Sequence, residues 1–518
     1  HFGFELTSGD LDLNGVLNVD FLQSGGELKG SQTIAGTYDL AGGDWDTEDG
    51  DTTTISSTGV LNLYSEDNND YDERDITNDG IVNWSGGDMD TTSGGSFTNN
   101  GTFNDLTKND HEIGETSGEA TFTNTASGTF TKSGNSVTRI YQDFDNAGTL
   151  NVQNGRISLK DESTFAATSA VSINSGAVLE VEDGSMITDG ATFSGDGTFI
   201  LESGTLTGTA DFDTRFEQVS GTIDGDFNFT NRWDYFSGTI TPGRNIDLIE
   251  GAFGSISTSG VLDLIASEIA VDFDSMLAWN SGTIRTGSEG GLAIDGLFTT
   301  DFDGEINQDL GDTGYFDVGG SFRKTGGTGT TTFDLPVNLT DSGRFEAHTG
   351  SVDLTAGGTS DGGLFDVWSG ATMNFSNGYT FNDGTTVPNG GNFNLNTGSF
   401  SINNSVGLGH HASINGGIIT GTHTLGGRVV VNGGVFDTAG TTTVDSNSSL
   451  EFANVEDNPL NRSFINNGKI HWSAGDMSGS GENSLTNNGE FGVSVDGTFG
   501  APDDDFTIIN NGKFVKIG

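Results

Sequence analysis

Three kinds of residue are scarce in this sequence, and each shortage excludes a class of protein. The chain has no cysteine, 5 prolines and 19 basic residues among 518. Without cysteine it can build neither a disulfide framework nor a thiolate metal site. With so little proline and no Gly-X-Y period, its 82 glycines fit neither a collagen-like triple helix nor a proline-rich linker. No apolar run reaches the ~18 residues of a spanning helix, so we expect no membrane insertion.

The shortage of basic residues leaves a very large negative charge. There are 74 acidic residues, and the formal net charge is −55. Nucleic-acid binding needs a basic surface, so we exclude that class of partner. The charge favours solubility and self-repulsion in a medium containing cations, and it also permits weak cation binding at many points.

Phenylalanine is the abundant large residue. The sequence has 36 phenylalanines against 7 tyrosines and 6 tryptophans, although hydrophobic residues make up only 32% of it. Disordered chains are poor in aromatic residues, so this composition argues against disorder. It favours a narrow core beneath a large polar surface.

One segment near the N-terminus returns near the C-terminus. Ile76–Asp90 recurs as Phe464–Ser478, and both copies contain Asn-x-Gly and then Trp-Ser-x-Gly-Asp-Met. The match continues without a gap from Thr91–Phe103 to Gly479–Phe491. Such duplication indicates a repeat protein, whose units fold by stacking on their neighbours.

Two short glycine motifs alternate along the chain. The first is Asn-x-Gly followed by alternating apolar residues, as in Asn99–Phe103. The second is a small residue, glycine, a polar residue and a large apolar residue, as in Ser203–Leu206. Glycine and asparagine tolerate positive φ, so both motifs predict sharp corners. The period-2 alternation after each corner predicts a half-buried strand.

The corners recur at the spacing of a solenoid coil. Gly80 and Gly101 are 21 positions apart, and Gly489 and Gly512 are 23 apart. We therefore predict an all-β fold, a right-handed parallel β-helix (β-solenoid) with coils of about 20–23 residues. We expect one continuous β-solenoid over residues 1–518, with an acidic interruption near residues 65–75. A series of β-hairpins is the alternative, because Asn-Gly is also a favoured hairpin turn.

The corner-relative positions also predict what fills the core. Phe97, Phe122 and Phe144 occupy equivalent positions, so we expect their rings to stack in an internal ladder. We expect Asn99 and Asn487 to join asparagine ladders whose amides satisfy backbone groups at the corners.

With these residues in view, the chain resembles the repeat regions of large bacterial surface proteins. The pattern Trp-Ser-Gly-Gly-Asp-Met, followed by Thr-Asn-Asn-Gly-Thr-Phe, is similar to the degenerate strand repeats of autotransporter passengers and filamentous adhesins. The resemblance covers most of the chain. It implies an extracellular structural or adhesive role and brings no catalytic residue with it.

We predict that the protein is not an enzyme, with no catalytic residue and no cofactor-binding residue. Polygalacturonase-like β-helices combine Asn-Thr-Asp, Asp-Asp, Gly-His and Arg-x-Lys in that order. Here Gly409-His410 precedes the adjacent aspartates Asp503–Asp505, and neither Asn-Thr-Asp nor Arg-x-Lys occurs. With so many carboxylates, chance pairs at glycosidase separations are expected and carry little weight.

Calcium is the one cofactor that the sequence suggests. The acidic interruption concentrates oxygen ligands in one segment, and hard cations prefer several carboxylate and carbonyl oxygens from a flexible loop. The candidate metal ligands are Asp67, Asp70, Asp72 and Asp75. A solvated acidic loop without a bound ion is the alternative.

Two functions from different classes remain open. The first is an extracellular or cell-surface structural protein, a rod that assembles into a surface filament or layer or serves as an adhesin. The second is a carbohydrate-binding or carbohydrate-cleaving β-helix, which a groove of aromatic and carboxylate side chains on consecutive coils would favour. The segment Asn510–Gly518 is an ordinary corner and strand that stops mid-pattern. The chain is therefore either part of a longer repeat protein or a homo-oligomer that stacks head to tail into a filament, and we expect the filament.

Overall fold

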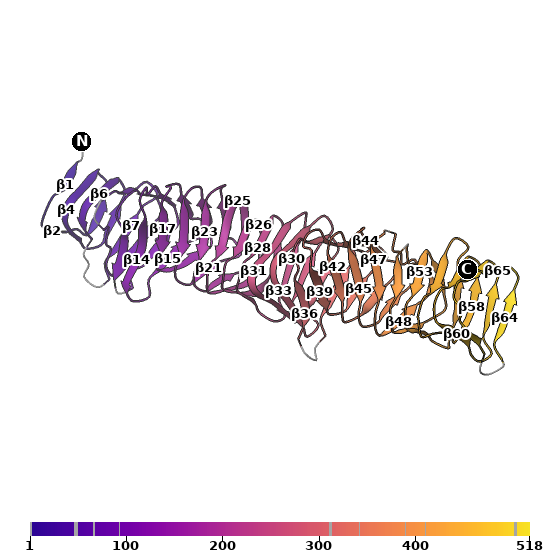
Figure 1. Cartoon of the computed structure of the whole chain (residues 1–518). Helices are drawn as coiled ribbons and strands as arrows, with labels where there is room; N and C mark the ends of the chain where they lie inside the picture. The colour runs from indigo at the N-terminus through magenta and orange to yellow at the C-terminus, as the bar shows by residue number, and fades with distance from the viewer. Residues whose placement is uncertain are drawn as a thin grey trace. The chain divides into compact units, whose positions relative to one another are not determined.

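The computed structural model describes residues 3–45, 50–65, 68–92, 94–309, 313–340, 342–388, 390–409, 411–501 and 505–517. These residues form strands, turns and bends, and none of them is helical. Contacts divide the chain into two compact units, His1–Asp247 and Leu248–Gly518. Each unit, taken by itself, is a stack of β-coils (Figure 1).

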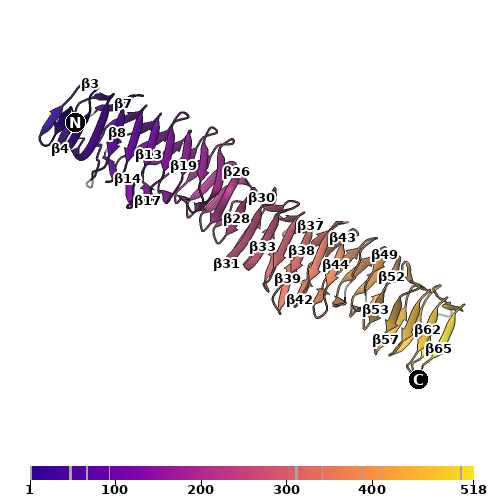
Figure 2. The same ribbon diagram turned by 90° about the horizontal axis from the view of Figure 1, so that it is seen from above.

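In the first unit a coil typically contains three short strands separated by corners. Each strand pairs with the equivalent strand of the next coil, and the pairing is parallel at all three strand positions of the coil (Figure 2). One such pair of coils consists of β12 (Phe97–Asn99), β13 (Thr102–Asp105) and β14 (His111–Ser117), followed by β15 (Thr121–Asn124), β16 (Thr129–Lys132) and β17 (Val137–Ile140).

The second unit repeats this plan. Its central coils pair strand by strand, again in parallel register. Two of them consist of β37 (Tyr315–Val318), β38 (Ser321–Lys324) and β39 (Thr330–Asp334), followed by β40 (Val337–Leu339), β41 (Arg344–Ala347) and β42 (Ser351–Leu354). Parallel pairing excludes the hairpin alternative, because the strands of a hairpin are antiparallel. The prediction of an all-β parallel β-solenoid is confirmed.

Coil length varies more widely than the predicted 20–23 residues. Asp211 pairs with Asn228, 17 positions on, where β26 (Thr205–Gln218) runs through a bend without a separate corner loop. Asp105 pairs with Lys132, 27 positions on, and this coil carries a longer corner before β14. The motif spacing therefore gives a typical coil and misses both extremes.

The predicted phenylalanine ladder is present in the first unit. The rings of Phe97 and Phe122 stack with centroids 4.8 Å apart and planes 4° apart, and Phe144 continues the stack at 5.8 Å from Phe122. All three side chains are fully buried. Burying a Phe side chain in this way stabilises the fold by roughly 2–3 kcal/mol.

Both predicted asparagine ladders are also present. In the first unit Asn78, Asn99, Asn124 and Asn146 form one chain, in which each Nδ2 donates to the Oδ1 of the next amide over 2.7 Å. In the second unit Asn487 accepts from Asn466 and donates to Asn510, over 2.7 Å each time. The same amides donate to corner carbonyls, as from Asn78 to Thr102 O at 3.1 Å. Polar groups that would otherwise be buried without partners are thereby satisfied.

The glycines of the two motifs are required for different physical reasons. In the second motif they adopt positive φ, as at Gly204 (72°) and Gly221 (73°), as expected. The positive-φ explanation is wrong for the Asn-x-Gly motif, because neither Gly80 nor Gly101 has positive φ. There a Cβ on Gly101 would lie 2.3 Å from the carbonyl oxygen of Gly80, one coil away. Glycine is needed because stacked backbones leave no room for a side chain.

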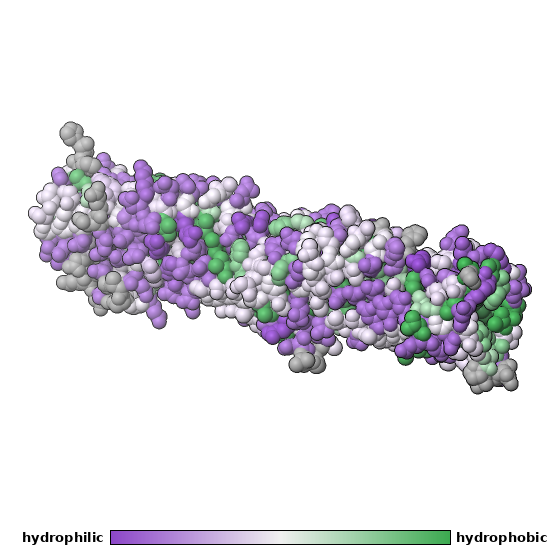
Figure 3. All heavy atoms as spheres, in the orientation of Figure 1, coloured by the Kyte–Doolittle hydropathy of each residue, from purple (hydrophilic) through white to green (hydrophobic). Residues whose placement is uncertain are grey.

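The outward positions of the strands are mainly polar. Strands such as β16 and β42 alternate half-buried and buried residues along their length. Figure 3 shows hydrophilic side chains over most of the visible face, with scattered apolar patches. The composition therefore produces narrow apolar cores beneath polar surfaces.

Candidate functional site

The structure describes three of the four predicted metal ligands. Asp67 lies outside the described residues. The Oδ1 of Asp75 accepts hydrogen bonds from Ser96 on the next coil, at 3.2 Å from its N and 2.6 Å from its Oγ. Asp70 and Asp72 remain near one another, since the charge of Asp72 helps to raise the pKa of Asp70.

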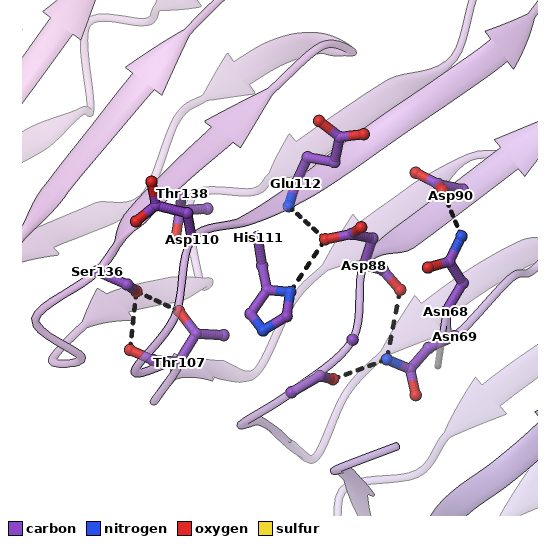
Figure 4. Close-up of polar contacts among 12 residues, drawn as sticks. Asn68, Asn69, Asp88, Asp90, Thr107, Asp110, His111, Glu112, Ser136 and Thr138 are labelled. Atoms are coloured by element: carbon purple, nitrogen blue, oxygen red, sulfur yellow. Dashed lines mark hydrogen bonds and ion pairs between the residues drawn. The ribbon is translucent and has the colours of Figure 1, made fainter. Parts of the chain in front are cut away.

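Asp70 instead belongs to a cluster that includes carboxylates from neighbouring coils. Asn68 Nδ2 donates to Asp90 Oδ2 at 3.0 Å, and Asp88 Oδ1 lies 3.0 Å from His111 Nδ1 (Figure 4). Burial raises the pKa of Asp90 to about 6, and the charges of four carboxylates add to this effect, namely Asp70, Asp88, Glu112 and Asp72. The pKa of Asp70 is raised in the same direction, with burial as the main cause.

Repulsion among these carboxylates makes the cluster suitable for a cation, although its geometry is open. Among the described residues, the buried Oδ1 of Asp70 has no hydrogen-bond partner, and a carboxylate oxygen is the kind of ligand atom that calcium uses. Among the described residues, however, no group of three or more His, Asp or Glu side chains is arranged to hold a metal ion. An ion here would need further ligands, supplied by water or by side chains that move slightly toward it.

A second concentration of negative charge lies on the first unit, at the corners of consecutive coils. A cavity of about 350 Å³ is lined almost entirely by carboxylates. Burial raises the pKa of Asp143, and the charges of Asp161 and Glu162 add to this shift. The carboxylates that line the cavity are Glu115, Glu119, Asp143, Asp161, Glu162 and Asp183.

The sequence analysis missed a set of buried cations. The side chain of Lys132 is fully buried, and its Nζ donates to Asp105 Oδ1 (3.3 Å), Thr107 Oγ1 (3.0 Å) and Ser136 Oγ (2.9 Å). Burial lowers the pKa of Lys132, an effect that the nearby charge of Asp105 opposes. In the second unit Lys324 is buried in the same way, with its Nζ 2.6 Å from Asp303 Oδ1.

Two buried arginines bind backbone carbonyls of preceding coils. Arg74 Nη1 donates to the carbonyl of Gly30 at 2.9 Å, 44 positions earlier in the chain. Arg462 Nη1 donates to the carbonyl of Gly421 at 2.8 Å, 41 positions earlier. Each arginine lies two residues before one of the duplicated segments, Ile76–Asp90 and Phe464–Ser478. Each therefore joins coils that are not adjacent in its own unit.

The parity of the strand pattern could have revealed these cations. In Thr129–Lys132, Phe130 points inward, so Lys132, two positions later, must also point inward. The same holds for Phe322 and Lys324 in β38. A cation at an inward position is expected to have a buried partner.

A cavity with mixed lining lies on the second unit. It measures about 520 Å³ and crosses four consecutive coils, formed by β31 (Phe253–Ile265), β33 (Met276–Gly287), β36 (Glu305–Gln308) and β39. We call it the β36 groove. It is lined by Ser259, Gly260, Gly282, Thr283, Phe302, Asp303, Gly304, Glu305, Thr330 and Thr332.

An aromatic floor supports the β36 groove. Phe302 and Trp279 meet edge to face with ring centroids 5.6 Å apart. A Cβ on Gly304 would lie 2.4 Å from the Phe302 ring and 2.5 Å from Trp279 Cζ2, so glycine is needed because both rings pack directly against its backbone. The Nε1 of Trp279 is buried without a hydrogen-bond partner among the described residues.

No protein-family model and no curated protein matches the sequence. Within the part of the chain that the structure describes, no helical segment could serve as a membrane span.

Proposed function

We propose that the chain is an extracellular structural and adhesive repeat protein of the kind found on bacterial surfaces. One observation supports this proposal: the buried side chains of the chain serve to stack its coils on one another. The phenylalanine ladder, the asparagine ladders and the buried cations all connect different coils to one another. A fold built in this way holds surface groups at fixed spacing, which suits a scaffold or an adhesin.

The extracellular location is tested by labelling cells of the source organism. Antibodies raised against the chain should bind intact cells, and immunogold particles should lie outside the cell envelope. Labelling that appears only after the cells are made permeable would contradict the proposal.

We also propose head-to-tail assembly. Within the described residues, β64 (Thr507–Asn510) and β65 (Lys513–Lys516) each pair with one strand only. Their other edges can accept a further strand. Ile508 and Phe514, 45% and 55% exposed, would be covered by a coil of a second copy.

Sedimentation velocity tests this assembly directly. The weight-average mass should rise with concentration in the presence of calcium, and electron microscopy should show filaments. Phe514→Lys should shift the equilibrium toward monomer, because a charge would be buried at the contact. A stable monomer over a wide concentration range would count against assembly.

Calcium is proposed as a stabilising ion held at the acidic clusters. We expect a higher melting temperature in millimolar calcium than in chelator at constant ionic strength, because a cation relieves repulsion among the carboxylates. An unchanged melting temperature would contradict this proposal.

Asp90→Asn tests the calcium proposal at one residue. The raised pKa of Asp90 means that its charge opposes folding above about pH 6 and that this cost disappears as the pH falls below that value. The variant should therefore be more stable than the wild type at pH 7, by roughly 1 kcal/mol after allowance for solvent screening. It should also gain less from calcium. Asp196→Asn, at an exposed position, is the matched control and should change neither property.

A further inference from the structure

We infer that the β36 groove binds a neutral oligosaccharide, an inference that rests on the adhesive part of the proposed function. Three features of the groove support it: free hydroxyls, a half-buried phenylalanine ring and an exposed carboxylate that repels acidic ligands.

The hydroxyl groups that face the groove are available to a ligand. Ser259, Thr283, Thr330 and Thr332 line it, and none of their hydroxyls has a hydrogen-bond partner among the described residues. Neighbouring hydroxyls of the same strands are occupied: Ser281 donates to the carbonyl of Thr258 (2.8 Å). A ligand rich in hydroxyls can donate to and accept from such groups, since each hydroxyl does both.

The ring of Phe302 suits the apolar face of a sugar ring. Phe302 lines the groove and is half-buried, and it packs edge to face on Trp279, which is fully buried beneath it. Small-molecule sites typically combine an apolar surface with a few polar groups that fix orientation, in cavities of about 300–1,000 Å³. Consecutive coils lie about 4.8 Å apart, close to the length of one pyranose unit, so hydroxyls on successive coils can meet successive sugars.

The charges in the groove favour a neutral ligand over an acidic sugar. Asp303 is already compensated, with Lys324 Nζ 2.6 Å from its Oδ1 and the N–H of Gly329 2.8 Å from its Oδ2. Glu305 is exposed and negative, so it can accept hydrogen bonds from sugar hydroxyls and repels carboxylated sugars.

The same arrangement favours binding without cleavage. The pKa of Asp303 is lowered, mainly because Lys324 donates a hydrogen bond to its carboxylate. A glycosidase needs one carboxyl group that stays protonated to donate to the leaving oxygen. Asp303 cannot fill that role, and Glu305 is the one other carboxylate that lines the groove.

Calorimetric titration of the whole chain tests this inference. The probes are maltohexaose, cellohexaose, laminarihexaose and xylohexaose, with hexagalacturonate as the acidic comparison. Thr330→Trp places a large ring in the groove. Thr372→Trp is the matched control, because Thr372 occupies the same register position two coils further on, outside the groove.

We expect at least one neutral hexasaccharide to bind the wild type at millimolar concentration or below, without release of new reducing ends. Thr330→Trp should weaken that binding at least about tenfold, while Thr372→Trp leaves it unchanged. The inference is overturned if no neutral probe binds, if hexagalacturonate binds as tightly, or if both variants behave alike. Immunogold labelling inside cells would overturn the surface location alone, so the two failures are distinguishable.

Discussion

Replacing Lys132 with methionine is expected to cost about 3–5 kcal/mol of stability in the surrounding coils, because it leaves the fully buried Asp105 charged and unpaired. Asp105 Oδ1 would keep its hydrogen bonds from Thr107 N (3.0 Å) and Oγ1 (2.7 Å). These neutral donors cannot replace a full positive charge at that oxygen. The effect should appear in urea unfolding and as faster hydrogen exchange in β13, β16 and β17.

Two further variants separate the loss of charge pairing from the loss of packing. Lys132→Met combined with Asp105→Asn should recover much of the stability, since no bare carboxylate remains. Arg139 lies in the same coil as Lys132, and Arg139→Met removes its exposed ion pair with Asp110 of the preceding coil, so stability should hardly change. If Lys132→Met alone were as stable as Arg139→Met, the buried pair would have no structural importance.

The fold could be predicted from the sequence because its signals are local. A corner glycine, a polar residue and an apolar residue recur together, so strand parity and coil stacking follow from short segments. Phe97, Phe122 and Phe144 stack as expected for this reason, as do Asn99 and Asn487. Coil length varies, but the strand predictions still hold, because the alternation of inward and outward residues starts again after each corner.

The candidate sites could be predicted only in part, because they are assembled across coils. Asp70 and Asp72 were found from one acidic segment. Asp90, which lies 22 positions beyond Asn68 and accepts its hydrogen bond, comes from the next coil. The β36 groove runs from Ser259 to Thr332, and its outward residues have no periodicity to mark them. Stacking does not constrain the outward side chains of a solenoid, so the stacking pattern does not predict which of them form a site.

His423 should make the second unit sensitive to acid. It lies in β52 (His423–Gly426), and its side chain is almost completely buried. Its Nδ1 is 3.2 Å from the carbonyl of Ile402 and its Nε2 is 3.1 Å from Thr442 Oγ1. Because a carbonyl only accepts, Nδ1 carries the hydrogen and Nε2 accepts from Thr442. Burial lowers the pKa of His423 to about 4, and the charge of Arg462 adds to this shift.

The sign of the pH effect follows from the two states of the chain. In the unfolded chain the His423 pKa is about 6.5, so between pH 6.5 and 4 the unfolded state binds a proton that the folded state excludes. Stability should therefore fall as the pH falls through this window, by about 3 kcal/mol in total from this residue. Above pH 6.5 neither state binds the proton, and His423 contributes nothing to the pH dependence of stability.

His423→Gln isolates this contribution. Glutamine stays neutral at every pH and can still bond Thr442 and the carbonyl of Ile402, so the variant should lose less stability than the wild type between pH 6.5 and 4. Asp90 acts in the opposite direction in this range, which is why the difference between the two proteins matters more than either curve alone. Urea unfolding at several pH values, together with hydrogen exchange in β52, measures that difference. Parallel curves for wild type and variant would show that His423 titrates normally, and its burial beside Arg462 would then have no consequence for acid stability.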